Sequence, residues 1–324
     1  MRALICKEFG PYENLEVAEV DAPPLNEGFV QVDVKAAGVN FPDILLVEGK
    51  YQAQPPFPFI PGTECSGVVS ELGKNTSGFK PGDRVIVATM LGGFAEQAVA
   101  PAAQVIPIPD AMSFEHAAAF TTIYGTSYHA LKQRAKLQPG ETVLVLGAAG
   151  GVGLATVQLA KAMGAKVIAA ASSAEKLEIA KEAGADELIN YSTEDLKARV
   201  REITANKGVD VVYDPVGGDY SEAALRATGW GGRYLVIGFA AGPIPKVPLN
   251  LALLNSRDIL GVFWGAWAGR NPRENAQNMK ELFDLYEAKK ITPHISAAYP
   301  LEEFAQAFAD IMERRVKGKV ILTF

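Results

Sequence analysis

A glycine-rich turn between a strand and a helix is the clearest chemical feature of the chain. Residues 142–146 have the pattern of a buried strand, and Gly147-Ala148-Ala149-Gly150-Gly151-Val152-Gly153 follows at once, ahead of an Ala- and Leu-rich helix. Glycine at 150 lets the backbone approach a pyrophosphate, and glycine at 153 lets the helix pack closely on the strand. Exposed amides at the helix start then bind the anion. This order predicts a dinucleotide site with contacts at Ala149, Gly150, Gly151 and Val152, although such turns also occur without a ligand.

The end of the next predicted strand indicates which dinucleotide binds. About twenty residues after the turn, an NAD enzyme commonly has an acid that holds the ribose hydroxyls. This chain has Ser172 and Ser173 there, followed by Lys176. Hydroxyls and an ammonium donate to a 2′-phosphate without repelling it, so the pattern favours NADPH over NADH. The alternative is that Ser173 only caps the following helix and that Lys176 is solvated on its surface.

Composition limits the class of protein and its partners. The chain has 324 residues, 48% of them hydrophobic and 21% charged, which is typical of a globular protein long enough for two domains. The 37 acidic residues outnumber 31 scattered basic ones, so we expect no nucleic-acid partner. No apolar run approaches the ~20 residues of a membrane span, and the start reads as a strand, so we expect a cytoplasmic protein. Cys6 and Cys65 are expected to be free thiols.

Two patterns of hydrophobic spacing divide the chain. Up to about residue 110, short β-branched runs alternate with Gly and Pro, which indicates a β-rich domain with tight turns. Ser113 is a predicted N-cap, and the Ala-rich stretch that follows to about Arg134 is predicted to be helical. Apolar strands then alternate with helices, which predicts a parallel sheet covered on both faces. The predicted strands are 142–146, 166–171, 187–190, 209–213, 233–238 and 258–262, followed by a helix from Asn271-Pro272, a strand at 294–299, a helix at 301–315 and a strand at 319–323.

Several short motifs together resemble the zinc-independent quinone oxidoreductase branch of the medium-chain dehydrogenase/reductase superfamily. Besides the glycine-rich turn they are Gly38-Val39-Asn40-Phe41-Pro42-Asp43, Pro61-Gly62-Thr63-Glu64, Pro81-Gly82-Asp83-Arg84-Val85, Asp214-Pro215-Val216-Gly217-Gly218 and Gly318-Lys319-Val320-Ile321-Leu322. The resemblance implies an α/β fold, with a GroES-like β-rich catalytic domain (1–121 and 292–324) and a doubly wound parallel-sheet Rossmann domain (122–291). It also implies an active cleft at their junction and a homodimer.

The chain departs at two positions from the zinc alcohol dehydrogenases of that superfamily. Where those enzymes resemble Gly-Val-Cys and Gly-His-Glu, this chain has Asn40 and Thr63, and neither side chain is an ordinary zinc ligand. We therefore expect no metal and a small-molecule acceptor that takes a hydride without a Lewis acid, such as a quinone. An enone or enoyl thioester (alkenal or acryloyl-CoA-like) is the close alternative. A non-catalytic NADPH-binding protein is the alternative of another class, since relatives of this branch serve as lens structural proteins.

The resemblance also implies roles for individual side chains. Asn40 is expected beside the nicotinamide and acceptor, where its amide would donate to a developing oxyanion. Tyr51 and Thr63 are the other catalytic candidates. Each has a structural alternative, as a turn amide, a tyrosine packed on the proline-rich loop, or a threonine bonded to backbone. The remaining expected cofactor contacts are Thr126, Tyr191, Val216, Gly238, Phe239, Phe263, Trp264 and Lys319.

Overall fold

The computed structural model describes all 324 residues, which form two compact units. The first unit comprises Met1–Thr122 and Pro293–Phe324, and the second comprises Ile123–Thr292. One unit is β-rich and the other contains a doubly wound parallel sheet, so the predicted fold class is confirmed. None of the helices is long and apolar enough to span a membrane.

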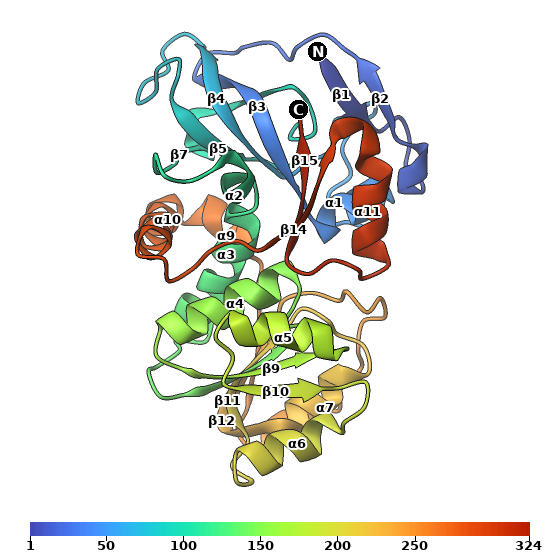
Figure 1. Cartoon of the computed structure of the whole chain (residues 1–324), viewed down its shortest axis with the longest axis vertical. Coiled ribbons are helices and arrows are strands. Elements are labelled where there is room, and N and C mark those ends of the chain that lie inside the picture. The colour runs from blue at the N-terminus through green and yellow to red at the C-terminus, as the bar shows by residue number, and fades with distance from the viewer. The chain divides into compact units, whose positions relative to one another are not determined.

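The sheet of the first unit joins both ends of the chain (Figure 1). Its seven strands have the order β14-β15-β3-β4-β5-β7, with β6 also paired to β3, while β1 and β2 pair separately. The strands are β1 (Arg2–Ile5), β2 (Glu16–Glu19), β3 (Phe29–Val39), β4 (Glu64–Leu72), β5 (Arg84–Ala88), β6 (Gln97–Pro101), β7 (Val105–Pro107), β14 (Ile295–Pro300) and β15 (Lys319–Thr323). The helices are α1 (Phe41–Val47), α2 (Phe114–Ala118) and α11 (Phe304–Met312), with 3-10 turns at Tyr12–Asn14, Ala102–Gln104 and Leu301–Glu303.

The carboxyl end of strand β3 is buried. Val30, Val32 and Val34 are buried in alternation, as expected for a strand with one face on the core. From Ala36 to Val39 every residue is buried, because β15 pairs with this end and α2 packs on it. The chain therefore leaves β3 inside the protein, so the polar residue that follows must find its hydrogen bonds there.

The second unit is a six-stranded parallel sheet in the order β10-β9-β8-β11-β12-β13. Its strands are β8 (Thr142–Leu146), β9 (Lys166–Ala171), β10 (Glu187–Asn190), β11 (Val209–Asp214), β12 (Thr228–Val236) and β13 (Asp258–Gly261). Its helices are α3 (Thr121–His129), which begins at the last residues of the first unit, a π-helix (Ala130–Arg134), α4 (Gly151–Ala162), α5 (Ala174–Glu182), α6 (Leu196–Ile203), α7 (Tyr220–Ala227), α8 (Asn250–Leu254), α9 (Trp264–Arg270) and α10 (Pro272–Glu287). The near-continuous apolar strands β8 and β9 are paired on both sides within it, as expected for strands covered on both faces.

The structure differs from the sequence-based expectation at two elements. Ser113 does cap α2 by accepting from the His116 backbone N–H (3.1 Å), but that helix ends at Ala118, so the predicted helix to about Arg134 is divided. Strand β12 begins at Thr228 rather than near Arg233, with a shift in register opposite β11. After Thr228 the strand continues with Gly229, Gly231 and Gly232 around the exposed Trp230, a composition without the alternation that marks a strand.

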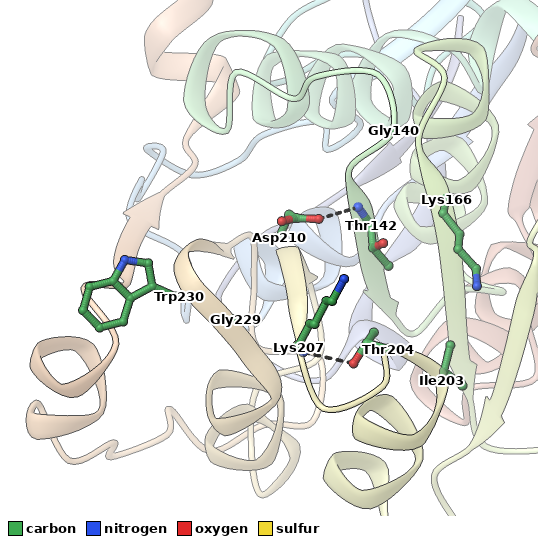
Figure 2. A pocket seen from close by; sticks show the side chains of 10 residues that line it. Gly140, Thr142, Lys166, Ile203, Thr204, Lys207, Asp210, Gly229 and Trp230 are labelled. Carbon is green, nitrogen blue, oxygen red and sulfur yellow. Dashed lines mark hydrogen bonds between the residues drawn. The ribbon is translucent and has the colours of Figure 1, made fainter.

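A cavity of about 540 Å³ lies at the amino edge of this sheet (Figure 2). Thr142, Lys166 and Asp210, each at the start of a strand, line it. Because the strands are parallel, their carboxyl ends all lie at the opposite edge. The two edges of one sheet therefore offer separate sites.

Gly153→Ala is expected to destabilise the protein by about 1–3 kcal/mol, because a Cβ there would lie 2.2 Å from the Gly147 carbonyl oxygen. The matched control is Gly265→Ala in α9, where an added Cβ meets no atom within 4 Å. The control should leave stability unchanged or raise it by up to ~1 kcal/mol. Urea unfolding of the three proteins measures both effects, and equal midpoints for both variants would contradict the packing argument.

Candidate active site

Except for Thr126, the predicted dinucleotide residues of the second unit follow the carboxyl ends of its strands. Gly150 is the N-cap of α4 directly after β8, and no side chain caps this helix end. A Cβ on Gly150 would meet no atom closer than the Gly147 carbonyl oxygen at 3.4 Å, so the fold itself leaves this position open. An open approach to uncapped helix amides is what a pyrophosphate needs. Ala149 lies in the turn, and Gly151 and Val152 are the first residues of α4.

The residues expected near a 2′-phosphate lie together after β9. The Lys176 ammonium is 3.5 Å from the Ser172 hydroxyl, and Ser173 caps α5 by accepting from the Lys176 backbone N–H (3.3 Å). The capping role considered for Ser173 is therefore present, and it holds the first turn of α5 beside Ser172. No carboxylate follows β9 in the segment Ala171-Ser172-Ser173. A contact of these side chains with a phosphate stays a prediction.

A buried aspartate that the sequence left without a role shapes the next loop. Asp214 Oδ1 accepts the backbone N–H groups of Val216 and Gly217, both at 2.8 Å. Its Oδ2 accepts the hydroxyls of Ser221 (2.9 Å) and Tyr234. Burial, with a smaller contribution from Asp214, raises the pKa of Tyr234, so this phenol remains a donor. Asp214 thereby fixes the loop whose Val216 side chain lies against Gly147 of the glycine-rich turn.

The other predicted cofactor residues of the second unit lie in different environments. Tyr191 packs on Tyr220 with ring centroids 4.3 Å apart. Phe239, after Gly238, lies against Gly217 of the Asp214 loop. Phe263 is the exposed N-cap of α9, and Thr126 is partly buried on α3.

Trp264 has a packing role that the sequence did not indicate. Its ring lies so close to Gly125 that an added Cβ there would be 2.6 Å from it, and its indole N–H donates to Asn275 (3.1 Å). It joins α3, α9 and α10.

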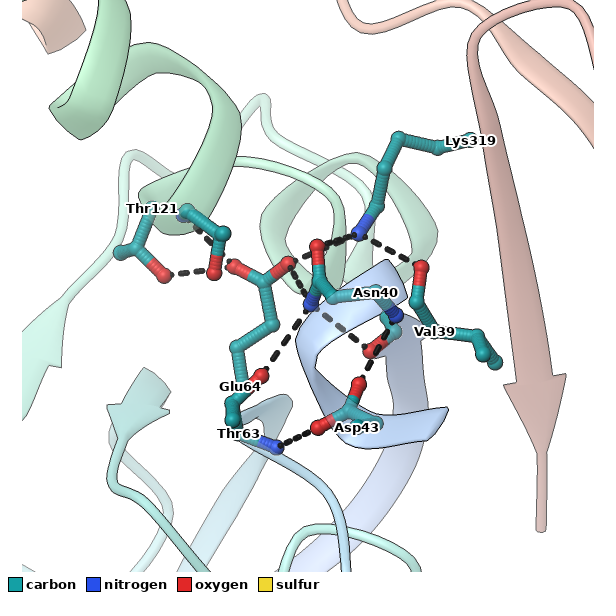
Figure 3. Close-up of polar contacts among 9 residues, drawn as sticks. Val39, Asn40, Asp43, Thr63, Glu64, Thr121 and Lys319 are labelled. Atoms are coloured by element: carbon teal, nitrogen blue, oxygen red, sulfur yellow. Dashed lines mark hydrogen bonds and ion pairs between the residues drawn. The ribbon is translucent and has the colours of Figure 1, made fainter. Parts of the chain in front are cut away.

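The first unit holds a buried polar group at the end of β3, which we call the Lys319 cluster (Figure 3). It consists of Asn40, Asp43, Thr63, Glu64, Thr121 and Lys319. The Lys319 ammonium donates to Glu64 Oε1 (2.9 Å), Asn40 Oδ1 (2.7 Å) and the Val39 carbonyl (3.0 Å). All three ammonium hydrogens are thus used within the protein, and the side chain is 3% exposed. A cofactor contact by Lys319 stays a prediction, and these bonds give the side chain a role in positioning Asn40.

Lys319 decides which way the amide of Asn40 faces. Because Asn40 Oδ1 accepts from the ammonium, Nδ2 turns the other way and donates to Glu64 Oε1 (2.9 Å) and Thr63 Oγ1 (3.2 Å), with Gly38 O at 3.3 Å. The two amide hydrogens therefore already have protein acceptors. The Thr63 hydroxyl receives one of them, which leaves its own hydrogen available to another acceptor.

The pKa values of the two carboxylates in the cluster are shifted in opposite directions. Burial opposes ionisation of Glu64, but Lys319 and hydrogen bonds from Asn40, Thr121 and Thr122 outweigh it and lower the pKa of Glu64. Burial raises the pKa of Asp43 to about 7, although the backbone N–H groups of Asn40 (2.8 Å) and Thr63 (3.0 Å) favour its charged form. The ion pair at neutral pH is therefore Lys319 with Glu64.

Sequence reasoning missed Asp43 and Glu64 as parts of the site. Both belonged to motifs that the resemblance used, next to Asn40 and Thr63. The available signal was an acid inside an otherwise apolar or turn motif, because a buried acid requires a partner.

Tyr51, the remaining catalytic candidate, is half-buried against the core of the first unit, and burial and Asp43 raise its pKa. In the whole chain, His, Cys, Asp and Glu side chains form no group of three or more that could hold a metal ion.

Asp43→Asn is expected to remove a pH dependence of stability between about pH 4 and 7. Asp43 titrates with a pKa of about 7 in the folded state and about 3.9 when unfolded. Within that window the folded state keeps a proton that the unfolded chain has lost, so the unfolding free energy of the wild type falls as the pH rises. The variant lacks this contribution.

Urea unfolding at pH steps from 4 to 8 measures the difference between the two profiles. Asp284→Asn, at an exposed position on α10, is the control and should follow the wild type. Parallel profiles for the wild type and Asp43→Asn would contradict the assignment.

Known proteins resemble the chain over its full length. Residues 26–110 match the family model of the alcohol dehydrogenase GroES-like domain, and residues 151–285 match that of the zinc-binding dehydrogenase. A quinone oxidoreductase-like protein 2 homolog of Nematostella vectensis is 40% identical over 99% of this chain and 88% of its own length. The structure of Escherichia coli quinone oxidoreductase complexed with NADPH matches with a TM-score of 0.93, 32% identity and 100% coverage of both chains.

The quinone oxidoreductase of Thermus thermophilus gives a TM-score of 0.87 with 35% identity, again covering 100% of both chains. Identity and coverage at this level extend through both units. The chain therefore belongs to the zinc-independent quinone oxidoreductase branch of the medium-chain dehydrogenase/reductase superfamily.

Proposed function

We propose that the protein uses NADPH to reduce quinones or related electron-poor carbonyl acceptors. The observation that carries the proposal is the Lys319 cluster, in which an amide and a hydroxyl occupy the positions of zinc ligands in the alcohol dehydrogenase relatives. A metal cation at Asn40 would have to displace the Lys319 ammonium from Asn40 Oδ1, which it contacts at 2.7 Å. Two like charges cannot share that oxygen, so the cluster favours an acceptor that needs no Lewis acid.

The second unit supports the identity of the reductant. The open Gly150 position and uncapped start of α4 would hold the pyrophosphate, and Ser172, Ser173 and Lys176 would hold the 2′-phosphate. When bound, NADPH supplies the hydride. Two relatives whose structures were determined with NADPH, those of E. coli and T. thermophilus, have the same fold.

The chemistry left to this chain is to stabilise negative charge on the acceptor oxygen and supply a proton. We assign the hydrogen bond that stabilises this negative charge to the Thr63 hydroxyl, whose oxygen accepts from Asn40 Nδ2 (3.2 Å), so its hydrogen points away from the amide. Asn40 is then a positioning residue, in place of the direct donor that the sequence predicted. Tyr51, whose pKa is raised by burial and by Asp43, keeps its proton at neutral pH and is the second candidate donor.

Anaerobic oxidation of NADPH by a panel of ortho- and para-quinones tests the activity, with alkenals and acryloyl-CoA assayed beside them. Faster turnover of the alkenes with a saturated carbon–carbon bond in the product would assign the enone or enoyl thioester activity instead. NADPH binding without turnover of any acceptor would make the protein a non-catalytic binder.

Thr63→Val is expected to lower kcat for the best acceptor about 10²-fold, as for loss of one oxyanion donor, while the Kd of NADPH stays unchanged. Thr76→Val is the control, because it removes a hydroxyl of the same unit that bonds only the Phe29 carbonyl (3.1 Å). Stopped-flow turnover and calorimetry measure the two quantities. An unaltered kcat for Thr63→Val would remove this residue from the mechanism.

Lys176→Glu is expected to lower kcat/KM for NADPH at least about tenfold and to leave kcat/KM for NADH unchanged, because an acid would face the 2′-phosphate. Lys181→Glu makes the same charge change on the exposed side of α5, where Lys181 contacts Glu178 at 3.7 Å. Equal losses of kcat/KM with both coenzymes would show that Lys176 does not contact the 2′-phosphate.

We further propose that a second copy of the chain covers the outer edge of β13. This strand ends the six-stranded sheet with one edge unpaired, and Ile259 on it is 39% exposed. Beside it in sequence, Leu253 and Leu254 of α8 are 79% and 63% exposed. A free strand edge next to an apolar patch is typical of a homodimer interface.

Ile259→Lys is expected to convert a dimer into a monomer in light scattering coupled to gel filtration, since a buried lysine would lack a partner. Met312→Lys places the same charge on α11 of the first unit and should leave the dimer intact. A wild-type protein of monomer mass would contradict the proposal.

A further inference from the structure

The amino edge of the second unit's sheet carries a groove that the proposed reaction does not use. Its larger lobe is the cavity of about 540 Å³, and a smaller lobe of about 200 Å³ adjoins it. Lys207, Gly208, Gly229 and Trp230 line both lobes, which makes them one continuous groove. We call it the basic groove. It lies at the edge opposite the glycine-rich turn, because the six strands are parallel.

The smaller lobe is lined by cations without an acid. Arg201, Lys207, Arg226 and Arg257 contribute to its wall, whereas no Asp or Glu does. Arg226 pairs with Glu222 (2.7 Å), which lies outside the lining, and Arg201 and Lys207 make no ion pair. The lobe therefore presents positive charge that the protein itself does not neutralise.

Arg257 adds a fixed charge at the back of this lobe. It is 9% exposed and donates to the carbonyl oxygens of Leu251 (2.8 Å) and Thr228 (2.6 Å) rather than to a carboxylate. Burial first, and then Arg201 and Arg226, lower the pKa of Arg257. Arg201 and Arg226 lie in the last turns of α6 and α7, where helix carbonyls attract cations, so the fold tolerates them there. Arg201 and Arg257 have no acidic partner in the lobe, so the repulsion between them is not offset there.

Trp230 supplies an aromatic surface at the junction of the lobes. Its side chain is 76% exposed, and Figure 2 shows the indole at one side of the groove with Lys207 between it and Lys166. Glycines at 229 and 231 flank it, and the Gly231 N–H donates to the Asn255 carbonyl (2.9 Å), which holds the backbone in place. An exposed indole next to cations offers a stacking face for an aromatic ring that is attached to an anionic group.

We propose that the basic groove binds a small phosphorylated aromatic molecule of the nucleoside phosphate class, with its phosphate in the smaller lobe and its ring on Trp230. The volume of the lobes falls within the ordinary range for small-molecule sites. Lys207 reaches both lobes and would contact the phosphate from the side of the ring. The site is separate from the dinucleotide site and does not depend on the proposed activity.

Titration of ADP into protein already saturated with NADPH tests the proposal by calorimetry. The stoichiometry of NADPH binding is measured first, so an absence of NADPH binding at the dinucleotide site is detected before ADP is added. We expect one further equivalent of ADP, weakened at least about tenfold by the double variant Arg201→Glu and Lys207→Glu. Lys280→Glu on the exposed face of α10 is the matched charge control and should bind ADP as the wild type does.

A second comparison separates the ring from the phosphate. Trp230→Leu should weaken the binding of ADP severalfold but leave the binding of inorganic phosphate unchanged. The double variant Arg201→Glu and Lys207→Glu should weaken the binding of both. Absence of a second ADP equivalent, or equal affinity in all variants, overturns the proposal. Loss of stability without loss of ADP binding in the charge variant would assign the arginines to the helix ends alone, against the proposal. If the fluorescence of Trp230 is quenched as the protein concentration rises, a second chain covers this residue, and the proposal is overturned.

Discussion

The interaction on which the first unit depends is the buried pair of Lys319 and Glu64. The two residues are 255 positions apart, on the last strand and at the start of β4, and both are almost completely removed from water. A lone charge in such a place would cost several kcal/mol, so each of these two side chains needs the other there. The pair explains why the unit must be made from both ends of the chain, with β15 beside β3.

The same pair controls the chemistry available to the unit. Lys319 holds Asn40 by its amide oxygen, and this fixes the amide hydrogens on Glu64 and Thr63. The donors of Lys319, Asn40 and Thr121 all have acceptors within this network, which makes it rigid, so Thr63 is held where its hydroxyl hydrogen is free for an acceptor. Asp214 has the equivalent structural role in the second unit, where it fixes a loop against the glycine-rich turn. In both units a buried carboxylate positions groups that the proposed reaction uses.

The sequence predicted the parts of the fold that local pattern determines. Residues 142–146, 166–171 and 187–190 are strands as predicted, and Ser113 caps a helix, because periodicity and capping are local. The early start of β12 at Thr228 was missed, since Gly229 and Gly232 lie close to the backbone of β11, a contact that local pattern does not include. The orientation of Asn40 could not be predicted either, because its determinant is Lys319, 279 residues away.

A double-mutant cycle on Lys319→Met and Glu64→Gln, followed by urea unfolding, tests the account most directly. Each single variant should cost about 3–5 kcal/mol, because it leaves a buried partner uncompensated. The double variant should cost clearly less than the two losses added together, since no uncompensated charge remains. Small single losses, or a double loss equal to their sum within about 0.5 kcal/mol, would contradict the claim that this pair organises the unit.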